Sequence, residues 1–460
     1  LEFRRVALPI SENERTLQLK ILMIILRTVK NISSLNIAAS VLLFLAAILA
    51  AVVANSSLSP VYQDFLLQEL HLRIGNFNLF SHGGHPLKMI EFINDCLMTV
   101  FFLAVGLEIK RELLVGELSS VRKAALPFIA ACGGMVVPVV IYALSVASGT
   151  PETRGMAIPM ATDIAFSLGV LSLLGKRVPL SLKIFLTAFA VVDDIGGILV
   201  IALFYSADVA YGYLIAAAVL YVFLYYMGKF GVTQKIFFLF FGVIIWYLFL
   251  QSGIHSTISG VILAFVIPAR PRLDAGKYIE RIRDIIGEFP VSKSDNIVLT
   301  NAQIATLKQV ERASDYVISP LQSLEDNLHG AVSFVILPLF AFANAGVVFS
   351  GSGSIVGDVS IAVAAGLLLG KFLGIYLFTW LAVKSGVALM PAGMNWKNIA
   401  GVSLLGGIGF TVSLFIANLS FADEYPELLN QAKFGVLVGT VLAGVLGYVV
   451  LNWVLPEREK

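Results

Sequence analysis

Two adjacent aspartates, Asp193 and Asp194, interrupt the apolar stretch Ile184–Phe204. The stretch is long enough to cross a bilayer, because a transmembrane helix needs about 20 apolar residues. An ionisable side chain at that depth is costly and usually functional. Consecutive residues of a helix point about 100° apart, so the two carboxylates cannot face each other and share one proton. We expect one of them to face a cavity and the other to contact a neighbouring helix.

Three more ionisable residues lie deep in apolar segments, namely Asp95, Asp163 and Lys371. A structural ion pair is an equal alternative for Asp95. For the other four residues it is disfavoured, because three acids and one base cannot neutralise one another. Those four are therefore the first candidates for binding and moving an ion. The lysine also lies beside a stripe of small residues that favours close helix packing, formed by Gly366, Gly370 and Gly374.

The composition places these residues in a membrane protein. Hydrophobic residues make up 58% of the 460 residues and charged residues only 13%, with a mean hydropathy of +0.88, whereas soluble proteins carry about 25% charged residues. We predict an all-α polytopic membrane protein with about twelve transmembrane helices and no cofactor. The predicted spans are residues 36–55, 88–113, 123–147, 155–173, 182–206, 211–230, 235–253, 255–268, 328–348, 359–385, 395–421 and 428–455.

The distribution of basic residues predicts the orientation. With both termini in the cytoplasm, the inner segments contain most of the 32 Lys and Arg residues, and the outer loops contain only Arg73, Lys88 and Arg154. This bias agrees with the positive-inside rule. Because the charges are sorted by side of the membrane, the net charge of +2 does not indicate a nucleic-acid partner.

This topology divides the chain into three parts. Residues 1–35 form a cytoplasmic segment with an amphipathic helix, residues 36–455 form the transmembrane domain, and residues 456–460 form a cytoplasmic tail. Within the domain, the outer loop 56–87 contains apolar residues around Gly75-Asn76, which predicts a β-hairpin over residues 70–82. The long cytoplasmic loop 269–327 contains an amphipathic pattern over residues 300–324, which predicts a helix with Thr300 or Asn301 as its N-cap.

Two spans carry signals for an interrupted helix. In the fourth span, Pro159 removes a backbone donor shortly before Thr162 and Asp163. The eleventh span has glycines at 406, 407 and 409. Irregular backbone at membrane depth is tolerated only where it is buried in protein or lines a water-filled cavity. Two three-helix units of opposite orientation, each with an interrupted middle helix, predict an inverted-repeat transporter with its site near the bilayer midplane.

Five long motifs resemble those of the NhaA-type sodium/proton antiporters of bacteria. They are "FFLAVGLEIKREL", "PMATDIAFSLGVLSLLGKRVP", "LKIFLTAFAVVDDIGG", "LPLFAFANAGV" and "GGIGFTVSLFIA", and the resemblance extends from about residue 36 to residue 455. It implies a homodimer in the bacterial inner membrane with two crossed broken helices, at spans four and eleven. It also implies exchange of Na⁺ or Li⁺ for protons. The loop 269–327 is longer than this family leads us to expect.

The resemblance also implies roles for single residues. Asp194 matches the cation-binding aspartate, and Asp193 matches a second acid that pairs with the lysine of span ten. The remaining matches follow in chain order: Asp95 is a family carboxylate, Glu108 an acid of the cytoplasmic funnel, Thr162 and Asp163 residues of the first broken helix, His255 a family histidine, Glu325 and His329 residues linked to the pH response, and Lys371 the span-ten lysine.

The chemistry of these residues suits such an exchange. Na⁺ prefers oxygen ligands, which Asp194, Asp193, Asp163 and Thr162 can provide. Burial disfavours the charged form of a carboxylate, so Na⁺ and H⁺ can compete for the same oxygens. Asp163 would offset the positive ends of the broken helices and Lys371 their negative ends. If two protons are exchanged for each Na⁺, the exchange is electrogenic.

Other classes of protein also place aspartates in a membrane. An intramembrane aspartyl protease needs its two aspartates on different helices, with glycines before one of them, whereas the glycines of "VVDDIGG" follow the pair. A membrane prenyltransferase would carry Asp-x-x-x-Asp motifs, and the chain has none. A cation-coupled solute symporter is the remaining alternative, although it would need a larger polar pocket than these few side chains suggest.

Overall fold

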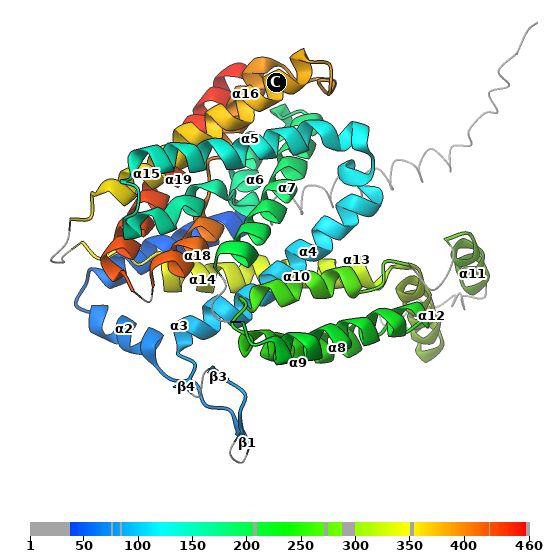
Figure 1. Cartoon of the computed structure of the whole chain (residues 1–460). Coiled ribbons are helices and arrows are strands. Elements are labelled where there is room, and N and C mark those ends of the chain that lie inside the picture. Colours follow the sequence, from blue (N-terminus) through cyan, green and yellow to red (C-terminus); the bar gives the residue numbers. More distant parts are fainter. Residues whose placement is uncertain are drawn as a thin grey trace, which may run out of the picture.

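The computed structural model describes residues 37–74, 77–82, 85–205, 209–270, 275–287, 300–349, 354–422 and 424–456. The predicted N-terminal segment and most of the predicted tail therefore lie outside the described residues. Among the described residues, eight helices are long and apolar enough to cross a membrane, and two further pairs of helices do so with a bend of more than 40°. This architecture, shown in Figure 1, is the predicted all-α polytopic membrane protein.

The helices before residue 270 begin with the span Ile37–Ala54. They continue as α2 (Ser59–Leu67), α3 (Met89–Phe92) extended by the π-helical turn η1 (Ile93–Leu97) into α4 (Met98–Val115), η2 (Glu117–Ser119), α5 (Val121–Ser145), η3 (Pro151–Met160), α6 (Ile164–Leu173), η4 (Gly175–Arg177), α7 (Leu180–Phe204), α8 (Tyr211–Lys229), α9 (Lys235–Leu250) and α10 (Thr257–Val266).

The helices after residue 270 start with two that belong to the long loop, α11 (Ala275–Gly287) and α12 (Asn301–Val317). The others are α13 (Pro320–Ala331) extended by η5 (Val332–Ile336) into α14 (Leu337–Asn344), α15 (Asp358–Ala365) extended by η6 (Gly366–Gly370) into α16 (Lys371–Lys384), α17 (Trp396–Leu405), α18 (Phe410–Phe421) and α19 (Pro426–Val454).

Every predicted span coincides with helical structure. The eight long helices and the two bent pairs fall on ten of the predicted segments. The predicted seventh and eighth spans contain the shorter apolar helices α9 and α10, which agrees with the expectation that the eighth is short. The hydropathy pattern alone was sufficient here, because a bilayer-spanning segment must be apolar over most of its length.

The predicted amphipathic helix over residues 300–324 is wrong in its extent. Helix α12 ends at Val317, and α13 begins at Pro320 as the start of the ninth span, earlier than the predicted residue 328. The break arises at Ser319, whose side chain caps α13 by accepting a hydrogen bond from the Gln322 N–H. At the other end, the Thr300 hydroxyl accepts a hydrogen bond from the Gln303 N–H, so Thr300 is the N-cap of α12.

The predicted hairpin is confirmed as a small antiparallel ribbon. Strand β1 (Arg73–Ile74) pairs with β2 (Phe77–Asn78), with Ile74 opposite Phe77. A second ribbon, which the sequence did not predict, joins β3 (Ser81–His82) to β4 (His85–Pro86). In Figure 1 the strands project from one end of the helices, below α2 and α3. We call this end the hairpin face.

Helices α5 and α16 approach each other unusually closely. A Cβ atom added to Gly374 would collide with the backbone oxygen of Gly133, and one added to Gly133 would collide with that of Gly374. One turn earlier, Gly370 contacts the backbone of Pro138. The predicted stripe of small residues therefore serves close backbone packing, as in other membrane helix pairs. This contact holds the start of α16, and hence Lys371, close to the centre of the protein.

Candidate functional site

The two interrupted spans bend at their breaks, as predicted. The first runs as η3 to Met160 and resumes as α6 at Ile164, with a bend of 45°. The second runs as α17 to Leu405 and resumes as α18 at Phe410, with a bend of 44°. Pro159 lies at the end of the first half-helix, and three glycines lie in the second break.

The breaks lie against each other and satisfy each other's backbone groups. The Thr162 hydroxyl donates a hydrogen bond to the Gly406 carbonyl at 2.7 Å, and the Asp163 N–H donates one to the Ile408 carbonyl at 2.6 Å. Backbone polar groups without a partner are very costly in a membrane. These bonds explain how irregular backbone can persist in the middle of the bundle.

Asp163 caps two helices with one carboxylate. Its Oδ1 atom accepts a hydrogen bond from the Phe166 N–H in α6 at 2.9 Å. Its Oδ2 atom accepts two from Thr411 in α18, from the hydroxyl at 2.6 Å and from the N–H at 3.2 Å. Helix N-termini carry partial positive charge, and two of them converge on this carboxylate. The geometry suits charge compensation better than cation binding, because both oxygens already accept hydrogen bonds.

Asp193 and Lys371 form an ion pair that is shielded from solvent. The Lys371 Nζ atom lies 2.6 Å from Asp193 Oδ2, and both side chains are 0% exposed. The other carboxylate oxygen, Oδ1, has no hydrogen-bond partner among the described residues. A buried charge needs its partner, and removing one member of such a pair typically costs about 3–5 kcal/mol.

Asp194 points to the other side of α7. It is 6% exposed and lines a cavity of about 290 Å³ together with Thr162 and Asp163. Within the part of the chain that the structure describes, no residue donates a hydrogen bond to the Asp194 carboxylate. The adjacent aspartates thus divide as their helical spacing predicts, one against a neighbouring helix and one in a cavity.

The predicted funnel residues line the same cavity, which we call the Asp194 cavity. Glu108 reaches it from α4, and Glu325 and His329 reach it from α13. The Nε atom of Arg111 lies 3.1 Å from Glu325 Oε1 and links α4 to α13 at the wall of this cavity. The structure therefore brings three of the four residues predicted for entry and pH response to one place.

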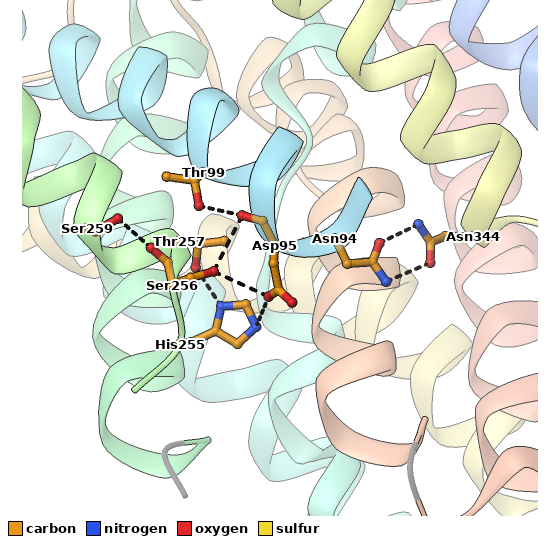
Figure 2. A network of polar contacts seen from close by, with 8 residues as sticks. All are labelled: Asn94, Asp95, Thr99, His255, Ser256, Thr257, Ser259 and Asn344. Carbon is orange, nitrogen blue, oxygen red and sulfur yellow. Dashed lines mark hydrogen bonds and ion pairs between the residues drawn. The ribbon is translucent and has the colours of Figure 1, made fainter. Parts of the chain in front are cut away.

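The fourth, His255, lies elsewhere, beside Asp95. Its Nε2 atom is 3.5 Å from Asp95 Oδ1, and the Ser256 hydroxyl lies 3.3 Å from the same oxygen. Figure 2 shows this group at the junction of α10 with the span of α4. Asp95, His255 and Ser256 line a second cavity of about 680 Å³, bordered by His82 and His85 of the small strands. We call it the hairpin-face cavity.

Sequence reasoning missed Thr411 and Arg111. Thr411 lies in the first turn of the helix that follows the second break. The repeat of two broken spans therefore offered a signal, because the residues beside the first break were already candidates. Arg111 is part of the motif "GLEIKREL", but a basic residue near the inner end of a span is expected for orientation alone. Nothing in the local sequence shows that it reaches Glu325, because the two residues are far apart in the chain.

The arrangement can hold a monovalent cation with oxygen ligands. Asp194 offers an open carboxylate, Asp193 Oδ1 lacks a hydrogen bond, and Thr162 supplies a hydroxyl beside them. Among the described residues, no group of three or more His, Cys, Asp or Glu side chains could hold a metal ion. A cation here would therefore depend on hydroxyl, backbone or water oxygens in addition to the carboxylates.

Comparison with known proteins agrees with this geometry. Residues 30–451 match the sequence family described as Na⁺/H⁺ antiporter 1. The chain is similar to the "Na(+)/H(+) antiporter NhaA" of Bacteroides thetaiotaomicron, with 74% identity over 438 residues, which is 95% of this chain and 100% of the relative. The protein of that name from Porphyromonas gingivalis is 47% identical over 437 residues, which is 94% of this chain and 96% of the relative.

The matched region includes every residue assigned above to the two cavities. Both broken helices, the aspartate pair and Lys371 lie inside residues 30–451. A match over most of the chain, together with relatives of high identity, identifies the family. The chain is a multi-pass membrane protein that belongs to the Na⁺/H⁺ antiporter 1 family.

Proposed function

We propose that this protein exchanges Na⁺ or Li⁺ for protons by competition at Asp194, with alternating access to the two sides of the membrane. The observation that carries the proposal is the Asp194 carboxylate, which is nearly buried and yet opens into a cavity beside two broken helices. Burial disfavours a bare carboxylate charge. The site is therefore stable when it holds either a cation or a proton, and least stable when it is empty and ionised.

This difference supplies the coupling. A conformational change that carries the site across the barrier is favourable only for the loaded or protonated carboxylate, because an empty charge would have to cross a region of low dielectric. Na⁺ leaving on one side is then replaced by H⁺ for the return. No further machinery is needed for obligatory exchange.

The Asp193–Lys371 pair supports an electrogenic version of the exchange. Lys371 lies within 2.6 Å of Asp193, and Asp193 is the chain neighbour of Asp194. A cation bound at Asp194 would raise the local positive charge and favour release of a proton from the lysine. Two protons would then be exchanged for one Na⁺, so that the membrane potential drives Na⁺ export.

The orientation follows from the basic residues. We infer that both termini are cytoplasmic, that the hairpin face is outside, and that the Asp194 cavity opens inward in a bacterial inner membrane. Lys110, Arg111, Arg122 and Lys123 cluster at the end of α4 and the start of α5, on the side away from the hairpin. A cluster of that kind is typical of the cytoplasmic side.

Reconstituted vesicles test the exchange directly. The protein is placed in proteoliposomes with a pH-sensitive dye, and Na⁺ or Li⁺ is added outside. We expect a pH change in the parent and none in Asp194→Asn, because the amide keeps the shape of the carboxylate but cannot ionise. Asp64→Asn makes the same chemical change at an exposed position of α2 and should behave like the parent.

Two outcomes would contradict the proposal. Exchange in Asp194→Asn at the parent rate would remove Asp194 from the mechanism. A pH change that required an added solute as well as Na⁺ would favour the symport alternative instead. Clamping the membrane potential with K⁺ and valinomycin then tests electrogenicity, because only electrogenic exchange is accelerated when the potential is discharged.

We also propose that the hairpin joins two copies of the chain. The strands are two residues long and project from the hairpin face, so their outer edges can pair across a two-fold axis. Deleting residues 70–82 should weaken the dimer in detergent while leaving exchange in place. An intact dimer after the deletion, or a monomer that cannot transport, would count against this role.

A further inference from the structure

Three spans repeat one order of residue types between the two cavities. Each has an aliphatic residue lining the Asp194 cavity, then a phenylalanine, and then an asparagine nearer the hairpin face. The three series, read towards the hairpin face, are Val105, Phe102 and Asn94 in the span of α4; Leu337, Phe340 and Asn344 in α14; and Val412, Phe415 and Asn418 in α18. Their chain directions differ, because the span of α4 is antiparallel to the other two.

The phenylalanines pack together as one layer. Phe415 is its centre, with ring centroids 5.6 Å from Phe102 and 6.3 Å from Phe340. The exposed fractions of the three side chains are 3% or less. A hydrated cation cannot pass through packed aromatic rings without losing its water, and the rings offer no oxygen in exchange. This layer is therefore a barrier to ions.

The asparagines form a second layer on the hairpin side of the rings. Asn344 donates a hydrogen bond to Asn94 Oδ1 at 2.8 Å, and Asn94 Nδ2 lies 3.4 Å from Asn344 Oδ1. Asn418 donates to the same Asn344 oxygen at 2.9 Å. Figure 2 shows the Asn94–Asn344 pair bridging two helices beside the Asp95 group. Each of the three amides comes from a different span.

The two layers lie where the cavities come closest. On α18, Val412 lines the Asp194 cavity, whereas Phe415 and Asn418 line the hairpin-face cavity. Val412 and Phe415 are three helical positions apart, which is about 4.5 Å. On the span of α4, Asn94 lines one cavity and Val105 the other. Along α18 the two cavities are thus separated by about one helical turn.

We propose that Phe102, Phe340 and Phe415 form the gate between the cation site and the hairpin-face cavity, and that Asn94, Asn344 and Asn418 form its latch. This inference rests on the proposed alternating access. Opening requires α18 and α14 to move relative to α4, which separates the rings and breaks the amide bonds between spans. The hairpin-face cavity, with Asp95 and His255 on its wall, is then the exit for the cation.

The two layers have different chemical parts in this gate. The rings exclude water and ions and provide the seal. The amides lie beside a polar cavity, so each bond lost on opening can be replaced by a bond to water at small net cost. The latch therefore stabilises the closed state by only a small free energy, so that opening remains possible. Asn344 is its centre, because both interhelical partners bond to its side chain.

Cysteine labelling tests the gate without relying on transport. The background carries Cys96→Ser and Cys132→Ser, and Val105→Cys reports from the Asp194 cavity. A charged, membrane-impermeant thiol reagent is added from the hairpin side of oriented vesicles. We expect Asn344→Leu, which keeps the size of the side chain but removes the interhelical bonds, to be labelled about tenfold faster than the background, equivalent to about 1.4 kcal/mol.

Variants of two other asparagines serve as comparisons for the labelling rate. Asn418→Leu removes one interhelical amide bond and should accelerate labelling by less. Asn430 also joins segments near the hairpin face, through both backbone groups of Val348, but it lies outside the layer, so Asn430→Leu should match the background. Equal labelling in Asn344→Leu and Asn430→Leu would overturn the proposal. If Asn344→Leu does not fold, unchanged labelling in Asn418→Leu overturns it.

The outcome is separable from the proposed function. Na⁺-driven pH changes are recorded in the same vesicles for the labelling background, which carries Val105→Cys. Absence of exchange there would contradict the antiport mechanism, while the labelling rates would still report whether the amide layer controls access. Exchange with no effect of the latch variants would retain the transport mechanism and remove the gate.

Discussion

The Asp194 cavity and the hairpin-face cavity contain similar side chains in different backbone surroundings. Each has acids on its wall, together with one histidine in the Asp194 cavity and three in the hairpin-face cavity. Asp95 lies in the continuous helical path from α3 through η1 to α4, and its carboxylate has Ser256 and His255 as neighbours. Asp194 instead faces two interrupted helices, and no described residue donates a hydrogen bond to its carboxylate.

If Asp194 binds the cation as proposed, the difference indicates what an ion site requires beyond acids and a cavity. Broken helices bring partial charges and hydroxyl groups to membrane depth, and Asp163 and Lys371 balance them. The carboxylate that remains without protein partners is available to a cation. In the hairpin-face cavity the Asp95 carboxylate already has protein neighbours, Ser256 and His255. We therefore expect variants at the first cavity to abolish or alter transport, and matched variants at the second to have smaller effects.

The largest contrast is expected between Asp193→Asn and Asp95→Asn. The first removes the buried partner of Lys371 and an acid beside the cation site, so Na⁺-driven proton movement in proteoliposomes should be lost or nearly lost. The second leaves an amide that can still bond with Ser256, and exchange should stay close to that of the parent. Loss of exchange in Asp95→Asn alone would reverse the assignment of the two cavities.

Lys371→Gln should change both stability and coupling. Removing the ammonium leaves Asp193 as a buried charge without compensation, which costs about 3–5 kcal/mol, so the melting temperature should fall. With one proton carrier fewer, any remaining exchange should generate a smaller membrane potential. Thermal unfolding and a potential-sensitive dye measure the two effects. A stable variant with unchanged potential would exclude Lys371 from the mechanism.

The hydrogen bonds of two threonines, Thr411 and Thr99, allow the surroundings of Asp163 and Asp95 to be compared. The Thr411 hydroxyl bonds to the Asp163 carboxylate at 2.6 Å, whereas the Thr99 hydroxyl bonds to the backbone oxygen of Asp95 at 2.5 Å. Hydrogen bonds to charged groups contribute about 1.5–3 kcal/mol and neutral ones about 0.5–1.5 kcal/mol. Thr411→Val should therefore lower the melting temperature more than Thr99→Val. The reverse order would contradict an ionised Asp163.

The smallest effect is expected at an ion pair outside both cavities. Arg154 Nη1 lies 2.9 Å from Glu424 Oε2, with side chains 51% and 56% exposed. The hydrogen bond from Arg154 lowers the pKa of Glu424. The contribution of the pair is thus present above the ordinary glutamate pKa of about 4.3 and disappears as the pH falls through the lowered value.

Exposed pairs contribute little in any case. Arg154→Gln should leave the melting temperature at pH 7 nearly unchanged, and parent and variant should coincide in acid. A clear loss of stability at neutral pH would show that this surface pair matters more than its exposure indicates. The measurement also supplies the baseline against which the variants of buried residues are judged.

Local sequence was sufficient wherever the controlling interaction is local. Hydropathy located the spans, because the bilayer imposes the same requirement on each segment separately. Pro159 and the glycines at 406, 407 and 409 located the breaks, because they act on their own backbone. The prediction of helix ends failed where an apolar spacing continued across a residue that ends one helix and caps the next. The apolar spacing from Ile304 to Leu324 predicted one continuous helix, although a new helix starts at Pro320. Leu321 and Leu324 belong to that new helix, which begins the ninth span, and both are buried in its packing.

The sequence by itself determined that this is a membrane protein and where its spans and breaks lie, and it predicted that the intramembrane acids bind the transported ions. The tertiary structure decided which aspartate faces the cavity, that Thr411 joins Asp163, and that three amides meet between the cavities. These facts depend on contacts between residues far apart in the chain, such as the pair Asp193 and Lys371, separated by 178 positions. Rotation and depth of each helix are set by its neighbours, and a single segment does not contain that information.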